Sequence, residues 1–262
     1  FVWPTSVEPI ERTPTQTKIV LPLDVGDEDA QAEIAEGLQD LGPRTLLFLR
    51  HINEISWMVG GTAAGLYFRD DPKIVGPGVR QVSLMGQQDG RDIEERWLVF
   101  SREVTNEGTP VGFVEIAFSL SLDSGATRRV LPLSDSTLVV FFPTVLSTNT
   151  GFLLQGPFRT TPSRDNIPVN DGWNKQLVGE ASELLVDALR WMAAEDMLDV
   201  NALQSLPLQR DRFTGNLLAP LFDHLANALQ NEPLLPCGEA VYACAKEVQL
   251  SRTQDLRDLF DS

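Results

Sequence analysis

The middle of the chain carries short apolar runs rich in Val, Ile, Phe and Trp, a pattern typical of β-strands. In one such run Val114, Ile116 and Phe118 occupy one face of an extended strand, while Glu115 and Ala117 occupy the other. One face of this strand is therefore predicted to be core. The same reasoning predicts strands over residues 46–49, 55–59, 66–68, 79–85, 94–104, 112–120 and 137–142, with a tight turn at Gly60-Gly61 and turns around 88–90, 106–108 and 123–125.

The last third of the chain has the spacing of helices instead. Apolar residues recur every three or four positions over residues 173–192, and the pattern repeats over residues 217–229. Pro220 falls inside the second stretch, where it either begins the helix or kinks it.

Before the strand-rich middle, the sequence pattern predicts one strand and one helix. Residues 17–23 are predicted to form a strand. The acidic residues that follow begin a predicted helix over 27–41, because carboxylates in a first turn suit the helix dipole. Gly42-Pro43 ends that helix.

Strands that come first and helices that come last predict an α+β fold. We expect a mainly antiparallel sheet with helices on one face, followed by a C-terminal helical part. The sequence shows no internal repeat and no low-complexity run.

Charge narrows the range of partners. The 262 residues include 21 Lys and Arg against 37 Asp and Glu, which gives a net charge of −16. A surface this acidic repels nucleic-acid backbones and anionic membranes, so neither is expected as the main partner. No apolar run is long enough to cross a membrane, and the first residues do not form a signal peptide.

The content of Cys and His excludes other classes of protein. Two cysteines are too few for a disulfide framework, and two histidines leave little material for a metal site, so no metal is predicted. We expect a reducing, cytoplasmic compartment. A nucleophile pair formed by Cys237 or Cys244 with His224 stays open as a weak third class, a free-standing hydrolase.

Common nucleotide and hydrolase motifs are absent from the sequence. There is no Gly-x-x-x-x-Gly-Lys-Ser/Thr phosphate loop, no Gly-x-Gly-x-x-Gly fingerprint, no Gly-x-Ser-x-Gly elbow and no His-Glu-x-x-His. The chain also starts without Met inside an apolar phrase, which predicts that it is a piece of a longer protein. Part of any active site is then expected outside it.

Two segments resemble a known family. Residues 16–23, Gln-Thr-Lys-Ile-Val-Leu-Pro-Leu, look like the last strand of the ATP-binding domain shared by DNA gyrase, heat shock protein 90, histidine kinases and MutL, the GHKL superfamily. That strand is commonly Gly-Thr-x-Ile-x-Leu-x-Leu, and here Gln16 replaces its Gly. In the heat-shock chaperone an acidic helix and a short apolar strand follow, as predicted here over 27–41 and 45–49.

The second segment combines several features in a fixed order. Residues 141–144 are Phe-Phe-Pro-Thr, and residues 150–158 are Thr-Gly-Phe-Leu-Leu-Gln-Gly-Pro-Phe. A loop with Ser-Arg-Asp-Asn-Ile at 163–167 and a Trp-Asn helix start at 173–174 follow. This order resembles the repeat unit of sacsin and its bacterial relatives, in which a GHKL ATPase module precedes such a segment. Ser163-Arg164-Asp165 matches the Ser-Arg-Glu loop of the chaperone's middle domain.

The resemblance implies an organisation and a set of site residues. It implies the tail of an ATP-binding domain over 1–26, a β-rich middle or transducer domain over 27–170, and a helical part over 171–262. Arg164 would reach the terminal phosphate of the nucleotide as the catalytic arginine. The remaining site residues that it implies are Arg159, as an alternative to Arg164, with Thr17 and Lys18 near the nucleotide.

The resemblance also implies a cofactor and partners. The longer protein would bind ATP and Mg²⁺, whereas this chain alone would hold neither, because the superfamily's Glu-Asn and Asp-x-Gly-x-Gly elements are absent from it. Its partners would be the ATP-binding domain upstream in the same chain and a client protein, and a homodimer stays open.

Simpler interpretations stay open beside these. Arg164 could be a surface arginine or form a salt bridge with Asp165 or Asp171. Trp173 and Asn174 could be a buried aromatic and a local hydrogen-bonding residue. The competing function is a non-enzymatic interaction module with no nucleotide role.

Overall fold

The computed structural model describes residues 28–59, 63–88, 90–122, 129–163, 166–238 and 241–248. The chain divides into two compact units, residues 1–40 and residues 41–262. Within the first unit the described element is α1 (Glu28–Gln39), which confirms the helix predicted over 27–41. The strand predicted over 17–23 lies outside the described residues.

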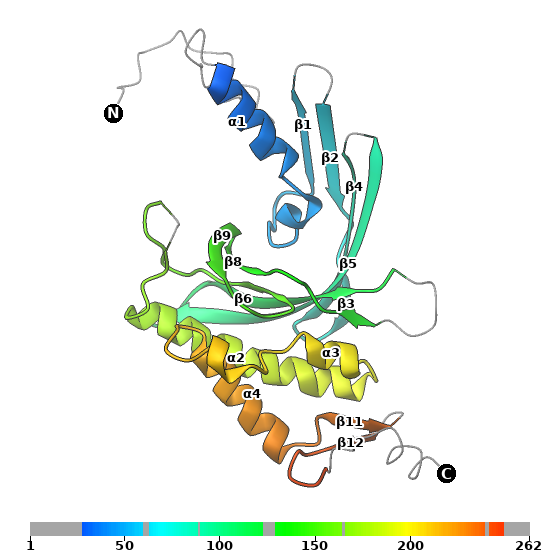
Figure 1. Cartoon of the computed structure of the whole chain (residues 1–262), viewed down its shortest axis with the longest axis vertical. Helices are drawn as coiled ribbons and strands as arrows, with labels where there is room; N and C mark the ends of the chain where they lie inside the picture. Colours follow the sequence, from blue (N-terminus) through cyan, green and yellow to red (C-terminus); the bar gives the residue numbers. More distant parts are fainter. Residues whose placement is uncertain are drawn as a thin grey trace. The chain divides into compact units, whose positions relative to one another are not determined.

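The second unit is built on a ten-stranded sheet, shown in Figure 1. Its strands run in the order β1-β2-β4-β5-β6-β10-β8-β9, with β3 paired to β4 and β7 paired to β6. All pairs are antiparallel except β10 with β8. The strands are β1 (Glu54–Val59), β2 (Ala63–Arg69), β3 (Lys73–Gly76), β4 (Val79–Gln88), β5 (Arg91–Asn106), β6 (Thr109–Leu120), β7 (Val130–Leu131), β8 (Thr137–Val140), β9 (Phe142–Ser147) and β10 (Leu153–Gln155).

The longest strands, β5 and β6, form a hairpin at the centre of the sheet. Its turn is Glu107-Gly108, and both residues have positive φ angles, 50° and 79°. A two-residue turn with both φ angles positive matches the right-handed twist of the strands that it joins. The turn predicted around residues 106–108 is therefore confirmed.

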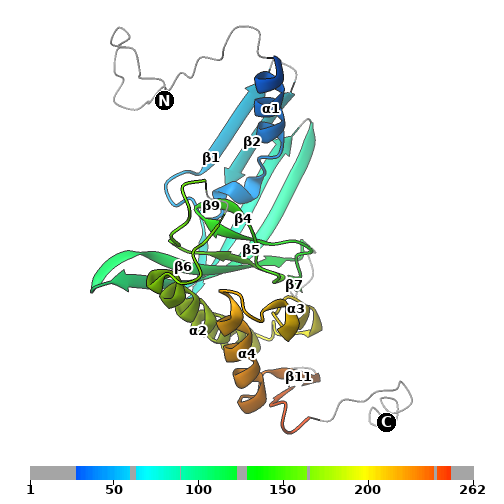
Figure 2. The ribbon, with the colours of Figure 1, turned by 60° about the vertical axis from the view of Figure 1, so that its left-hand side comes forward.

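Helices cover one face of this sheet (Figures 1 and 2). They are α2 (Gly172–Ala194), the short α3 (Val200–Gln204) and α4 (Ala219–Asn231). Pro220 lies in the first turn of α4, where the proline ring costs no helical hydrogen bond, so it begins this helix rather than kinking it. The predicted α+β class, with helices on one face of a mainly antiparallel sheet, is confirmed.

The core on the helix side is apolar. Phe100, Phe118 and Phe152 from the sheet meet α2 residues such as Leu185 and Leu189, and all five are buried. The Phe118 ring packs at a tilt against Phe152, with ring centroids 5.1 Å apart. None of the helices in the described part of the chain is both long and apolar enough to cross a membrane.

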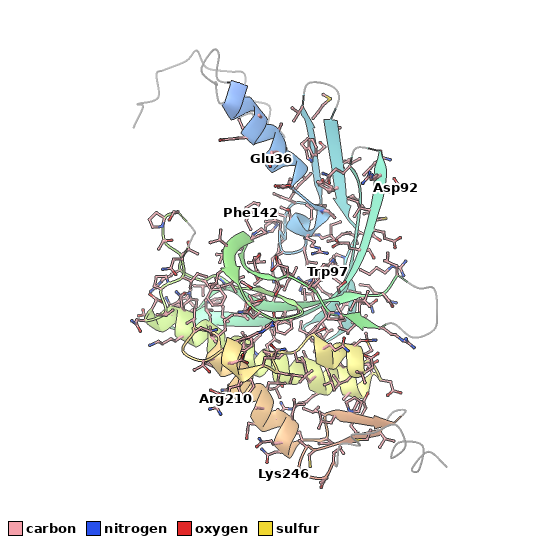
Figure 3. All side chains as sticks on the ribbon, viewed as in Figure 1. Glu36, Asp92, Trp97, Phe142, Arg210 and Lys246 are labelled. Carbon is pink, nitrogen blue, oxygen red and sulfur yellow. The ribbon has the colours of Figure 1, made fainter. Side chains whose placement is uncertain are left out.

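The opposite face carries a second core under the segment that precedes β1. This segment opens with the 3-10 helix η1 (Pro43–Leu46), and Leu46, Leu47 and Phe48 are buried. They face the side of the sheet to which Tyr67 and Trp97 point, and both aromatic side chains are fully buried (Figure 3 labels Trp97). Both faces of the central strands are therefore buried, not one as the sequence predicted.

One predicted strand is wrong, and a second is shorter than predicted. Residues 46–49 form no strand, because the backbone carbonyls of Leu46 and Leu49 accept hydrogen bonds from the guanidinium of Arg69 instead of from a neighbouring strand. The strand predicted over 137–142 breaks at Phe141, whose φ of 62° turns the chain between β8 and β9. A left-handed φ at a bulky residue gave no signal in the sequence.

The remaining elements are short. The 3-10 helix η2 (Arg210–Arg212) precedes α4, and a two-stranded sheet of β11 (Leu235–Gly238) and β12 (Val241–Ala243) follows it. Together with β3, β7, β10 and α3, these pieces are of two to five residues, too short for a periodic pattern to reveal.

Candidate functional site

The loop between β10 and α2 is held at its base by one buried side chain. Asn174, at the start of α2, is fully buried. Its Oδ1 accepts a hydrogen bond from the backbone N–H of Arg159 at 2.8 Å, and its Nδ2 donates to the carbonyls of Arg159 at 3.0 Å and Pro168 at 3.2 Å. One amide therefore ties together two loop positions nine residues apart in the chain and satisfies backbone groups that no strand pairs.

Residues at the start of α2 also hold the base of this loop. Asp171 caps α2 by accepting the backbone N–H of Asn174 at 3.0 Å. The indole Nε1 of Trp173 donates to the carbonyl of Pro157 at 2.9 Å. The hydrogen bond from Asn174 lowers the pKa of the Asp171 carboxyl, and Arg159 lowers it further.

Nearer its tip the loop is closed by a second set of hydrogen bonds. The backbone N–H of Thr161 donates to the carbonyl of Asn166 at 2.9 Å, and the N–H of Asn166 donates to Oγ1 of Thr161 at 3.2 Å. Ile167 beside this pair is 2 % exposed and anchors the returning chain. Hydrogen bonds therefore join Thr161 to Asn166 across this part of the loop.

Of the four residues predicted to form the site, the structure describes one, Arg159. Thr17, Lys18 and Arg164 lie outside the described residues. Arg159 is described, and its guanidinium forms an ion pair with Asp171 at 3.2 Å while the side chain is 60 % exposed. Asp171, considered above as a salt-bridge partner for Arg164, thus pairs with Arg159.

A buried polar cluster on the opposite face of the sheet was missed. Glu115 in β6 is 1 % exposed, and its Oε1 accepts from Arg50 at 3.1 Å, Arg80 at 2.9 Å and the hydroxyl of Ser101 at 2.9 Å. Arg50 also lies over the ring of Phe113, 3.6 Å from its centroid. A lone carboxylate within an apolar strand was the available signal, since such a group is buried only when it is paired.

Arg69 extends this cluster. Its guanidinium donates to the carbonyls of Leu46 and Leu49 and to Oδ1 of Asn53, the last at 2.6 Å. Burial lowers the pKa of Arg69, and the positive charge of Arg80 adds to this. These contacts hold the segment before β1 against the sheet, so we assign Arg69 to structure rather than to ligand binding.

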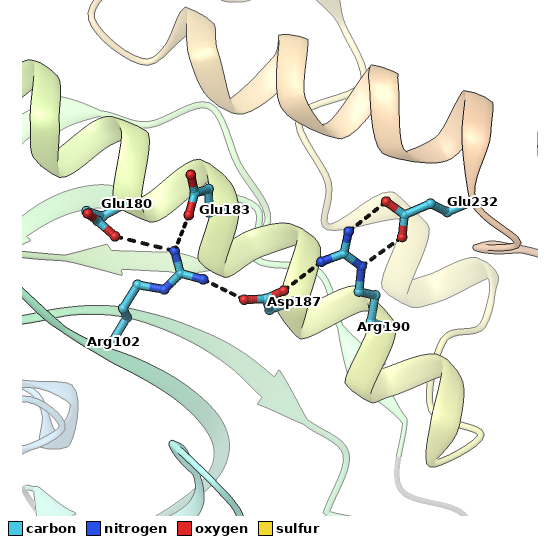
Figure 4. A network of polar contacts seen from close by, with 6 residues as sticks. All are labelled: Arg102, Glu180, Glu183, Asp187, Arg190 and Glu232. Atoms are coloured by element: carbon cyan, nitrogen blue, oxygen red, sulfur yellow. Dashed lines mark hydrogen bonds and ion pairs between the residues drawn. The ribbon is translucent and has the colours of Figure 1, made fainter.

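A network of charges links β5, α2 and the end of α4 (Figure 4). Arg102 contacts Glu180 at 3.3 Å, Glu183 at 2.6 Å and Asp187 at 2.5 Å along α2. Arg190 extends this network, because its guanidinium binds both carboxylate oxygens of Glu232 at 2.7 Å and Asp187 at 2.8 Å. The forked contact with Arg190 lowers the pKa of the Glu232 carboxyl.

This network lines a groove of about 430 Å³ between α2 and α4. Its charged groups bind one another, so the arrangement joins the two helices and the sheet. His224 also lines the groove, but no described hydrogen bond links it to either cysteine.

Neither cysteine has the surroundings of a catalytic nucleophile. Cys237 is exposed and its thiol donates to the carbonyl of Leu235 at 3.4 Å. A hydrogen bond with Glu247 raises the pKa of the Cys244 thiol, which disfavours the thiolate that would attack a substrate. Within the described ranges, no group of three or more His, Cys, Asp or Glu side chains is placed to hold a metal ion.

Comparisons with known proteins add no relative. No family model matches the chain, and neither a curated protein nor a solved structure matches it.

Proposed function

We propose that this chain is the end of a GHKL-type ATP-binding domain followed by a middle, or transducer, domain of the sacsin-like and heat-shock-protein-90-like kind. The middle domain senses nucleotide bound by the preceding segment of a longer protein and contacts a client or partner. The observation that carries this proposal is the clamp by Asn174. It fixes both sides of the loop in which the sequence places Arg164.

The clamp bears on catalysis because loop position matters for phosphoryl transfer. A guanidinium brought from a second domain stabilises the charge that develops on the transferred phosphoryl group. Its rigid fork of donors matches phosphate oxygens. A loop with a fixed base loses less conformational entropy when its tip docks. The free-energy cost of docking Arg164 is therefore expected to be lower than for a loop with a free base.

Two described features favour Arg164 over Arg159 for this role. Arg159 is held by Asp171, and its backbone N–H and carbonyl are held by Asn174. Thr161 and Asn166, which flank Arg164 in the sequence, are instead hydrogen-bonded to each other.

The two arginines on the η1 side of the sheet, Arg69 and Arg80, are already committed to other groups. The guanidinium groups of Arg69 and Arg80 are taken by backbone carbonyls, Ser101 and Glu115. ATP and Mg²⁺ are therefore assigned to groups of the preceding segment, with Thr17 and Lys18 near the nucleotide. When bound there, they supply the phosphoryl group and its neutralising charge. We place the longer protein in the cytoplasm.

The test compares arginine variants in the chain joined to its ATP-binding segment. Arg164→Ala should reduce ATP turnover at least about 100-fold with ATP affinity and thermal stability retained. Arg210→Ala, an exposed arginine on η2, is the matched control and should leave turnover unchanged. Unchanged turnover in Arg164→Ala would favour the alternative, an interaction module with no nucleotide role.

A second variant tests the clamp itself. Asn174→Asp keeps an acceptor for the N–H of Arg159 but cannot donate to the two carbonyls. It should lower turnover and speed amide hydrogen exchange at residues 159–168. Turnover that stays normal although exchange has accelerated would show that a fixed loop base is not needed.

The isolated chain gives a further prediction. Calorimetry should detect no ATP binding to it in the micromolar range, with or without Mg²⁺, because the adenine-holding elements are absent from its sequence. Micromolar binding would contradict the division of roles proposed here.

A further inference from the structure

One face of the sheet is covered at one end and open at the other. Leu98 and Phe100 in β5 are buried on the helix side. Side chains alternate along a strand, so Glu94 and Arg96 continue this same face toward the other end of β5. The register carries it from Glu94 to Met85 in β4 without a bulge. At this end none of the helices α2, α3 and α4, which belong to the same unit, covers it.

The open end is apolar. Phe68 lies opposite Met85, Leu66 lies two residues before Phe68, and Met58 lies diagonal to Leu66 on the neighbouring strand. Met58 is 72 % exposed, Leu66 47 %, Phe68 40 % and Met85 40 %. We call these four residues the open strip. An antiparallel sheet normally turns a polar face to water, so adjacent apolar side chains here mark a surface for another molecule.

The strip is bordered by carboxylates on the same face. Glu54 lies opposite Phe68, Glu94 opposite Met85 and Asp92 opposite Gln87, and all three are exposed. Among the described neighbours on this face, Arg96 provides a compensating charge, through its ion pair with Glu94 at 2.8 Å. The chain as a whole carries a net charge of −16. This charge opposes a second copy on the strip and favours a basic partner.

We propose that the open strip binds an amphipathic helix of a partner protein, with its apolar stripe on the four residues and lysines or arginines beside Glu54 and Asp92. A helix fits better than an added strand, because the exposed apolar atoms lie on the face of the sheet and not along its edge. Further along the same face α2 already packs in this way. The proposal does not rest on the nucleotide role.

The methionines give direct reporters of this binding. The chain has four, of which Met58 and Met85 are in the open strip. Met192 is buried against the helices and Met197 packs against that same core. The probe is a synthetic helix of Leu, Ala and Lys with leucines at three-four spacing. The control is a scrambled peptide of the same composition and charge.

With ¹³C-methyl-methionine labelling of the full chain, the helical peptide should shift the methyl signals of Met58 and Met85 and leave those of Met192 and Met197 in place. The scrambled peptide should shift none of them. Equal shifts from both peptides would mean that charge alone attracts them, and would overturn the proposal.

Variants locate the binding surface. Phe68→Ser should weaken binding of the helical peptide at least about 10-fold, since it removes the largest apolar contact. Val145→Ser, at a 73 % exposed position on β9, is the control and should bind as the unaltered chain does. Normal binding by a folded Phe68→Ser chain would overturn the proposal. A concentration-dependent dimer that Phe68→Ser abolishes would assign the strip to a second copy and overturn it as well.

Discussion

The β5–β6 hairpin is buried on both sides, but by different means. Toward the helices it presents Phe100, Phe118 and other apolar side chains, and the charged pairs on that side lie at the surface. Toward η1 it presents the buried carboxylate of Glu115, paired with Arg50 and Arg80. The two sides show that one face of a sheet can be buried by apolar packing and the other around a paired carboxylate. Burial decides how much each arginine–carboxylate contact contributes.

The largest expected effect is on the apolar side. Phe118→Ala should lower the free energy of unfolding by about 4 kcal/mol, because it removes a fully buried ring and leaves a cavity. Urea denaturation of the purified variant measures this. A loss below about 1 kcal/mol would mean that this side repacks freely, and the contrast between the two sides would disappear.

The polar side is expected to respond to the balance of charge rather than to volume. Glu115→Gln should cost about 3 kcal/mol, since it leaves the half-buried guanidinium of Arg80 without its counter-charge. The double variant Glu115→Leu with Arg80→Leu should recover most of that loss, because no unpaired charge stays buried. If the double variant is less stable than Glu115→Gln, the pair stabilises by packing and not by charge.

The smallest effect is expected from the exposed pair of Arg190 and Glu232. Arg190 lowers the pKa of Glu232 in the folded chain, so the pair stabilises above the unfolded pKa and this contribution is lost as pH falls through the folded one. Glu232 is 32 % exposed, which limits the contribution to below about 1 kcal/mol.

The measurement is a pair of urea midpoints, at neutral pH and at about pH 4. Glu232→Gln should narrow the difference between them, whereas Asp223→Asn, at an exposed carboxylate on α4, should not. If the difference between the two midpoints narrowed equally in both variants, the Arg190–Glu232 pair would not be the cause of the pH dependence.

Much of the fold follows from periodicity, and much of the candidate site does not. Long periodic elements such as α2, β5 and β6 were predicted, because burial of one face imposes a repeat on the sequence. The segment at residues 46–49 was wrongly predicted because its carbonyls are satisfied by Arg69, twenty residues away in the chain. The clamp by Asn174 was foreseen only as local hydrogen bonding at a helix start. Its span from Arg159 to Pro168 depends on how the loop folds back, which no spacing encodes.

The length of β5 has a structural consequence. It runs from the carboxylates beside the open strip to Arg102 under α2, and the ten residue steps from Asp92 to Arg102 span about 33 Å. Its pairing with β4 is regular throughout, and its pairing with β6 is regular as far as Val104. Since no bulge interrupts this stretch, one continuous hydrogen-bonded strand joins the open strip to the helix layer.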